Sequence, residues 1–175
     1  NTVMPNHQGN SLSTFYDDAK TLQPSFGLLY ELDLDPANGL DITLTWNDES
    51  GSANSPQTDA KLVNDLDLMV IDPDGNQILG NNFNAGYSVI GGVGDSLNNV
   101  ERVRIAPDSV TNSGQWLVQV MHRGGVNQDF SIVITGDATL VSRPDILAFP
   151  ESIYLSSDSP LQNDVVSVRV SWMNQ

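Results

Sequence analysis

The sequence contains no cysteine, and only seven lysines and arginines stand against 22 aspartates and glutamates. Disulfide bonds and thiolate zinc sites are therefore excluded. The formal net charge of −15 is spread along the chain and opposes binding to nucleic acid or to an anionic membrane surface. No apolar run approaches the ~18 residues that a membrane span needs. Core packing and metal ions held by oxygen ligands remain as means of stabilisation.

Helical periodicity is scarce, whereas apolar residues recur with a period of two along most of the chain. Only Ser13 to Leu22 could form a short helix. Short alternating segments separated by Gly, Pro, Asn and Asp indicate an all-β fold, an antiparallel jelly-roll-like sandwich or barrel. The expected strands are 28–34, 42–46, 66–70, 100–105, 116–120 and 130–134, followed by 146–149, 153–155 and 166–172.

The stretch LVNDLDLMVIDPDGNQILGNN, residues 62–82, is the most informative. Side chains two apart on a strand share a face and lie ~6.6 Å apart, so Asp65 and Asp67 face away from the alternating apolar residues. No Lys or Arg occurs from 62 through 101 to separate these carboxylates. Ca²⁺, which prefers carboxylate and carbonyl oxygens, is the leading candidate for the missing cation. The alternative is that both carboxylates are simply solvated on an outer face.

Other oxygen-bearing side chains are expected near Asp65 and Asp67. Segments on either side of the predicted strands can place them at one end of the barrel, where Ca²⁺ would require six to eight oxygen ligands. A further pair, on the amino-terminal segment, makes a possible second site. The candidates at the barrel end are Asp48, Asn98, Asn99 and Glu101, and the second pair is Asp17 and Asp18.

Several segments occur in an order that resembles a known family. FYDDAKTL, YELDL, DITLTWND, LVNDLDLMVIDPDGNQILGNN, NNVERVRI, SGQWLVQVMHRG and FSIVITGD, within residues 11–137, are similar to the C-terminal β-barrel of secreted subtilisin-like serine proteases. That barrel is jelly-roll-like, resembles the P-domain of proprotein convertases and commonly carries calcium. The resemblance implies an extracellular location, secreted or on the cell surface, and a protease domain upstream in the same chain.

The chain is expected to be part of a longer protein with two modules. Residues 1–10 are interpreted as a linker, 11–137 as the jelly-roll domain and 138–144 as a second linker. Residues 145–175 resemble the opening strands of a truncated immunoglobulin-like module of the cell-adhesion type. So small a sheet is marginal alone. We therefore expect residues 145–175 to pack on the first domain or to pair with another copy.

Catalysis is not expected from this segment. A serine protease needs Ser, His and Asp together, yet only His7 and His122 are available and no nucleophile motif surrounds any serine. His122 is interpreted as a surface histidine at a strand end. The preferred function is a non-catalytic, calcium-binding accessory domain that stabilises a subtilisin-like protease or aids substrate or surface binding. The alternatives are a free-standing jelly-roll module that binds carbohydrate or protein, and a structural spacer of a cell-surface protein. A protein or polysaccharide substrate is a possible partner.

Overall fold

The computed structural model describes residues 13–34, 39–51, 62–107, 114–141, 145–148, 153–155 and 168–170. For residues 13–16, 18, 145–148, 153–155 and 168–170 it describes the backbone only. Every regular element in this part of the chain is a β-strand, and the named strand pairs are antiparallel. The predicted all-β class is therefore confirmed as an antiparallel β-sandwich.

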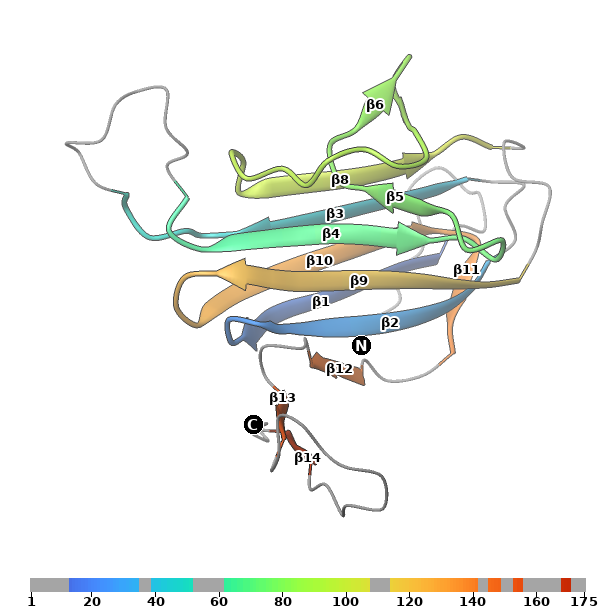
Figure 1. Cartoon of the computed structure of the whole chain (residues 1–175). Helices are drawn as coiled ribbons and strands as arrows, with labels where there is room; N and C mark the ends of the chain where they lie inside the picture. The colour runs from blue at the N-terminus through green and yellow to red at the C-terminus, as the bar shows by residue number, and fades with distance from the viewer. Residues whose placement is uncertain are drawn as a thin grey trace.

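Two sheets form the sandwich (Figure 1). The first, sheet A, has the strand order β1-β10-β3-β8, and the second, sheet B, has the order β11-β2-β9-β4-β5. The strands of sheet A are β1 (Ser13–Leu22), β3 (Leu40–Trp46), β8 (Val100–Ile105) and β10 (Gln128–Gly136). Those of sheet B are β2 (Phe26–Leu34), β4 (Asp65–Ile71), β5 (Gln77–Leu79), β9 (Gly114–Gly124) and β11 (Ala138–Leu140).

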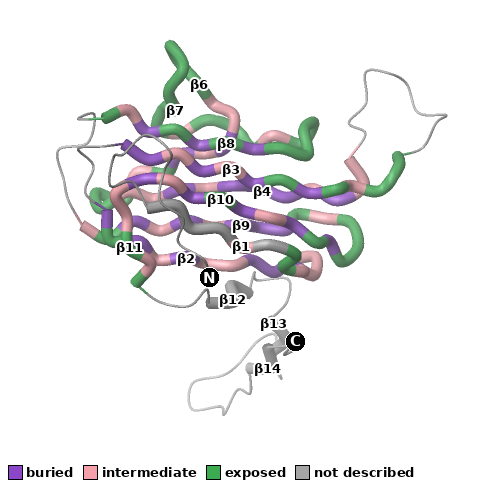
Figure 2. Tube along the Cα trace, turned by 180° about the vertical axis from the view of Figure 1, so that it is seen from behind, coloured by how far each residue is buried: buried purple, intermediate pink, exposed green. Residues whose placement is uncertain are grey.

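The core lies between the two sheets and follows the predicted alternation. On β4, Leu66, Leu68 and Val70 are fully buried, whereas the intervening residues face the other side of the sheet. On β8 the inward positions are Glu101, Val103 and Ile105. Figure 2 shows buried stretches interrupted by less buried residues along the central strands. The carboxylate-bearing residue Glu101 therefore occupies a core position, where it is the β-ladder partner of Leu44 on β3.

The short helix considered for Ser13 to Leu22 is wrong, because this segment is strand β1 and pairs with β10 along its length. The register shifts between Asp17 and Lys20, and Ala19 has a φ of 53°. Such a bulge inserts extra residues into one strand and interrupts the period of two. The interruption explains why the sequence pattern there did not indicate a strand.

The outer edge of β2 is covered by two later segments. β11 pairs with Leu32 to Leu34, and β12 (Asp145–Ala148) pairs with Phe26 to Leu29. Covering an edge removes a row of unpaired backbone groups that would otherwise invite association. β13 (Ile153–Leu155) and β14 (Val168–Val170) form a separate two-stranded sheet. The assignment of this region to a second module stays a prediction.

The free edge of β8 is covered by the chain that follows β5. This segment includes the short hairpin of β6 (Phe83–Asn84) and β7 (Tyr87–Ser88), which projects beyond β8 in Figure 1. The backbone N–H groups of Arg102 and Arg104 donate to side-chain oxygens of Asn81 and Ser88 at 3.0 and 2.9 Å. Side chains thus satisfy this edge in place of another strand.

Candidate functional site

Three segments that carry or adjoin predicted ligands meet at one end of the sandwich. They are the end of β3, the turn before β4 and the start of β8. Trp46 joins them, because its backbone N–H donates to Asn99 O at 3.2 Å and its indole Nε1–H to Asn64 O at 3.1 Å. Asn99 returns a side-chain hydrogen bond to Trp46 O at 2.9 Å. The arrangement brings β4 and β8 close to each other at the open side of the sandwich.

Glu101 spans the gap between β8 and β4. Its residue is 1% exposed, and its Oε2 accepts the Leu68 N–H at 2.7 Å. β5 pairs only with Met69 to Ile71, so Glu101 takes over where that ladder ends. Glycine at position 80 is needed for this approach, since a Cβ there would lie 2.2 Å from Glu101 Oε2. The second carboxylate oxygen, Oε1, is buried and has no hydrogen-bond partner.

Burial dominates the electrostatics of Glu101. Removal of the carboxylate from water raises its pKa from 4.5 to about 8, despite the hydrogen bond from Leu68. The charges of Asp67, Asp95 and Asp65, in decreasing order, contribute to this rise after burial. Below pH 8 and without a cation, Glu101 is therefore mainly neutral.

Asp65 and Asp67 lie beside this group on the outer face of β4. Burial raises the pKa of Asp65, the charge of Asp67 adds to that effect, and Arg123 opposes it. Asp65 Oδ1 is a second buried oxygen without a hydrogen-bond partner. Asp67 is 6% exposed, and a Cβ at Gly94 would lie 2.9 Å from its Oδ1. The chain around Gly94 thus covers a carboxylate that the sequence placed on an outer face.

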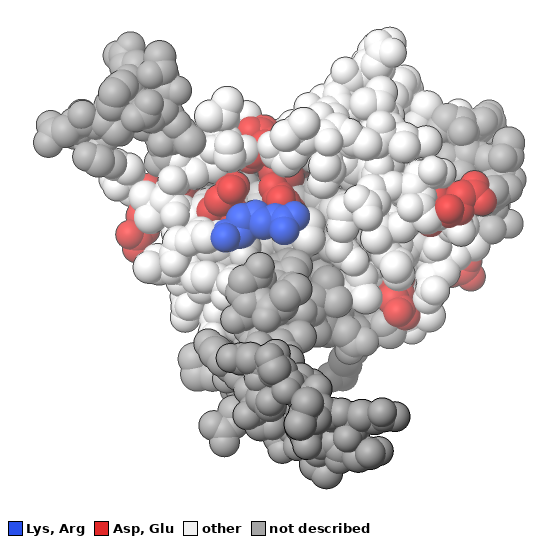
Figure 3. Space-filling view, in the orientation of Figure 1, with Lys and Arg blue, Asp and Glu red and all other residues white. Residues whose placement is uncertain are grey.

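The carboxylates of Glu101, Asp65, Asp67 and Asp95 are named here the acidic cluster. A basic side chain also contacts this cluster, and the sequence did not indicate that contact. Arg123 on β9 donates from Nε to Asp67 Oδ2 at 2.6 Å. Figure 3 shows basic side-chain surface directly against a group of acidic side chains on this face. The expectation that no basic side chain neutralises these carboxylates is therefore wrong for Asp67. This contact could not be predicted from sequence, because Arg123 is 56 positions from Asp67 and the two residues are brought together only by the pairing of β4 with β9.

Asp95, which was not among the predicted ligands, is the fourth carboxylate of the cluster. Burial alone would raise its pKa, but hydrogen bonds from Asn81, Asn98 and Leu97 outweigh burial and lower it. The side-chain amides of Asn81 and Asn98 lie 2.6 and 2.7 Å from Asp95 Oδ2. Asn98, a predicted ligand, therefore presents its amide nitrogen to Asp95. The sequence signal is the local Asp-x-x-Asn spacing, which is typical of an Asx turn.

The remaining predicted ligands have other partners. Asp48 accepts the N–H groups of Val63 and Asn64 at 2.8 and 2.9 Å, so its carboxylate fixes the turn before β4. On β1, Asp17 lies 3.4 Å from Lys20 Nζ and accepts from the Tyr30 hydroxyl at 3.3 Å. The Asp18 side chain lies outside the described residues. The second site, at Asp17 and Asp18, stays a prediction.

The acidic cluster has the negative charge that a cation site requires, but its side chains do not have the geometry of a metal site. Among the residues that the structure describes, no three His, Asp or Glu side chains are arranged to hold a metal ion. Two buried, unpartnered carboxylate oxygens nevertheless fit a hard cation, because they are the ligand atoms that Ca²⁺ takes. The residues therefore fit the ion in chemistry, and its binding would require local rearrangement around Arg123.

His122 is not the surface histidine that the sequence suggested. It is fully buried, and its Nε2 lies 2.6 Å from Val126 O. Burial lowers its pKa, which the backbone contact with Val126 partly opposes. The ring is part of the packing around the turn that joins β9 to β10.

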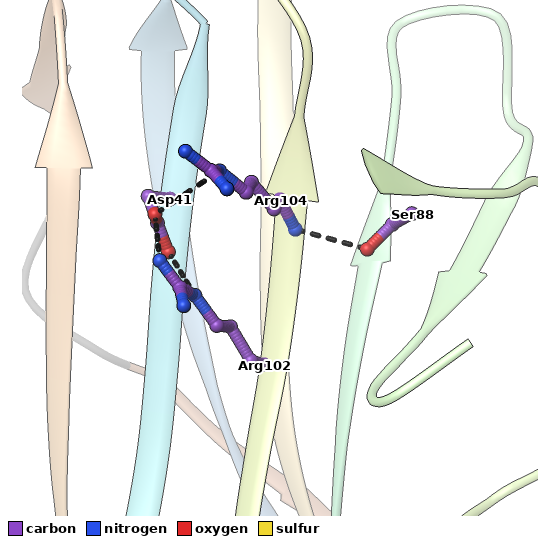
Figure 4. A network of polar contacts seen from close by, with 4 residues as sticks. All are labelled: Asp41, Ser88, Arg102 and Arg104. Carbon is purple, nitrogen blue, oxygen red and sulfur yellow. Dashed lines mark hydrogen bonds and ion pairs between the residues drawn. The ribbon is translucent and has the colours of Figure 1, made fainter. Parts of the chain in front are cut away.

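Arg102 and Arg104 lie on the outer face of β8 and do not contact the acidic cluster in the described contacts. Both contact Asp41 on β3, and Arg102 Nε donates to Asp41 Oδ1 at 2.7 Å (Figure 4).

No helix in the described part of the chain is long and apolar enough to cross a membrane. Comparison with models of protein families and with curated proteins gave no match.

Proposed function

We propose that this chain is a non-catalytic, calcium-binding accessory domain of an extracellular subtilisin-like serine protease. Its role is to stabilise the enzyme or to help position it on a substrate or surface. The proposal joins a β-sandwich, an acidic cluster and the order of sequence segments described above. The calcium component and the protease component have separate support and separate tests.

The observation that carries the calcium component is the buried, half-satisfied carboxylate of Glu101 among three aspartates. Four carboxylates lie within electrostatic reach of one another, and one guanidinium accompanies them. A carboxylate buried without its full set of partners is costly unless it is neutralised. Ca²⁺ bound by Glu101, Asp65 and Asp67 would neutralise it, with the further ligands that Ca²⁺ requires coming from backbone carbonyls and water.

The strand order supports the jelly-roll component. Sheet A runs β1-β10-β3-β8 and the main part of sheet B runs β2-β9-β4-β5. These eight strands form two interleaved four-stranded sheets, with β1 and β10 paired in one sheet and β2 and β9 in the other. Two Greek keys folded into two sheets of four are the arrangement of a jelly roll.

The protease component rests on the resemblance of residues 11–137 and is consistent with the buried position of His122. A histidine held inside the sandwich has no access to a substrate, so this residue serves the fold. The coding sequence before Asn1 tests the component. A subtilisin-type domain with its Asp, His and Ser motifs would support it, and an unrelated domain would refute it.

Thermal unfolding in EDTA and in Ca²⁺ tests the calcium component. At 100 times its dissociation constant the ion should stabilise the fold by ~2.7 kcal/mol. Asp65→Asn and Asp67→Asn should reduce this gain, whereas Asp33→Asn, which changes an exposed aspartate of β2, should preserve it. If the wild type melts at the same temperature in both buffers, the cluster binds no calcium.

A further inference from the structure

Exposed apolar side chains are concentrated in the segment from Phe83 to Val100, named here the apolar segment. Among the described residues, ten large hydrophobic side chains are exposed, and seven of them lie in this stretch. Ile90, Val93 and Leu97 are 66%, 78% and 65% exposed. Scattered apolar residues on a surface are ordinary, but a concentration of them marks an interaction site.

Polar side chains, rather than apolar packing, fix the backbone of the apolar segment. Asn82 donates from Nδ2 to Val93 O at 2.9 Å and accepts the Val93 N–H at 3.1 Å. Asp95 accepts the Leu97 N–H at 2.9 Å, and Gly91 N–H donates to Gln77 O of β5 at 2.7 Å. The segment therefore has its polar groups turned toward its own backbone and its apolar groups toward solvent. A surface ordered in this way loses little conformational entropy when it binds a partner.

Two arginines of β8 lie beside the hairpin at the start of the apolar segment. The Arg104 guanidinium lies 5.2 Å from the centre of the Tyr87 ring, at the base of the hairpin. Arg104 and Arg102 share the single carboxylate of Asp41, and each arginine side chain is 46% exposed. Figure 4 shows both arginines on β8 directed to Asp41 on the neighbouring strand. These are two of only seven basic residues in a chain of net charge −15.

We propose that the apolar segment and the two arginines form a binding surface for a protein segment in which apolar side chains are accompanied by carboxylates. Apolar contacts to Ile90, Val93 and Leu97 supply the buried area. The arginines supply charge complementarity, because two guanidiniums share one carboxylate and retain capacity for another. This proposal does not depend on calcium binding.

The chemistry of the surface favours a protein segment over a sugar or a lipid. Sugars stack on open aromatic rings, but aliphatic side chains dominate here and Arg104 covers one face of Tyr87. An anionic membrane would be repelled by the net charge of −15. A short peptide carries few charges, so the net charge repels it less than it repels an extended anionic surface. Its carboxylates can also contact the exposed guanidiniums of Arg102 and Arg104 directly.

Selection from a random peptide library displayed on phage tests the proposal. The library is panned on the immobilised full chain and depleted on the variant with Ile90→Ser, Val93→Ser and Leu97→Ser. Enriched peptides should combine apolar residues with Asp or Glu. A synthetic peptide of the enriched sequence should bind the Ser variant at least tenfold more weakly, and Arg102→Gln with Arg104→Gln should weaken it in the same direction.

A matched control changes exposed valines outside the segment, Val126→Ser with Val141→Ser, and should leave peptide binding unchanged. Thermal midpoints identify any variant that fails to fold. The proposal is overturned by the absence of enrichment, by enrichment of basic peptides, or by equal binding to the Ser variant. Flotation with phosphatidylcholine vesicles, or self-association, that depends on Ile90, Val93 and Leu97 would also overturn it, because lipid or a second copy would then be the occupant.

Discussion

Glu101→Gln should remove most of the loss of stability that the wild type undergoes as the pH rises from 4.5 to about 8 in the absence of metal. Glutamine is nearly the same size, stays neutral at every pH and keeps an oxygen that can accept the Leu68 N–H. The wild-type carboxyl has its pKa raised from 4.5 to about 8, first by burial and then by neighbouring carboxylates. The substitution therefore removes one titration and little else.

The sign and magnitude follow from linkage. Because the folded state holds the Glu101 proton more tightly than the unfolded state does, this contribution to stability is complete below pH 4.5 and is lost as the pH rises to about 8. The two pKa values differ by an amount that corresponds to about 5 kcal/mol, at ~1.36 kcal/mol per pH unit. In EDTA at pH 8 the variant should be several kcal/mol more stable than the wild type.

Urea unfolding followed by tryptophan fluorescence, from pH 5 to 8.5 in EDTA, measures this difference. The exposed Glu49→Gln variant serves as the control and should keep the wild-type slope. Asp65 contributes to that slope in both proteins, so the difference between wild type and variant isolates Glu101. An unchanged slope in Glu101→Gln would refute the assignment of a buried, mainly neutral acid between β4 and β8.

Three further predictions concern neighbouring contacts. Asp48→Ala should lower stability by about 1.5–3 kcal/mol to the same extent with and without Ca²⁺, because two backbone N–H groups lose their acceptor; a thermal melt in both buffers checks this. Arg123→Met should lower stability in EDTA but tighten Ca²⁺ binding in calorimetry, since it frees Asp67; weaker binding would contradict the exchange of Arg123 for an ion. Truncation after Val141 should expose the β2 edge at Phe26 to Leu29 and promote self-association in sedimentation velocity; a monomer would show that β12 is dispensable there.

Most of the fold could be predicted because alternation reports directly which side of a strand faces the core. Leu66, Leu68 and Val70 are all buried as their spacing predicted. β1 could not be recognised, because a bulge between Asp17 and Lys20 breaks the period of two. Local pattern is thus informative where strands are regular and fails where register shifts.

The site was only partly predictable, because its contacts depend on the pairing of strands. Asp65 and Asp67 could be grouped from their spacing, and the alternation of Glu101 with Val103 and Ile105 already places it on the core face. Arg123 could not be assigned, because a shift in register between β9 and β4 decides which carboxylate it meets. The partners of a buried charge depend on tertiary structure more than on sequence neighbours.

A crystal structure of the chain grown with abundant Ca²⁺, with anomalous data collected, tests the central claim most directly. We expect an anomalous peak ~2.3–2.6 Å from Glu101 Oε1 and from oxygens of Asp65 and Asp67, with Arg123 withdrawn from Asp67. Arg123 still bound to Asp67, with only water near Glu101, would contradict it.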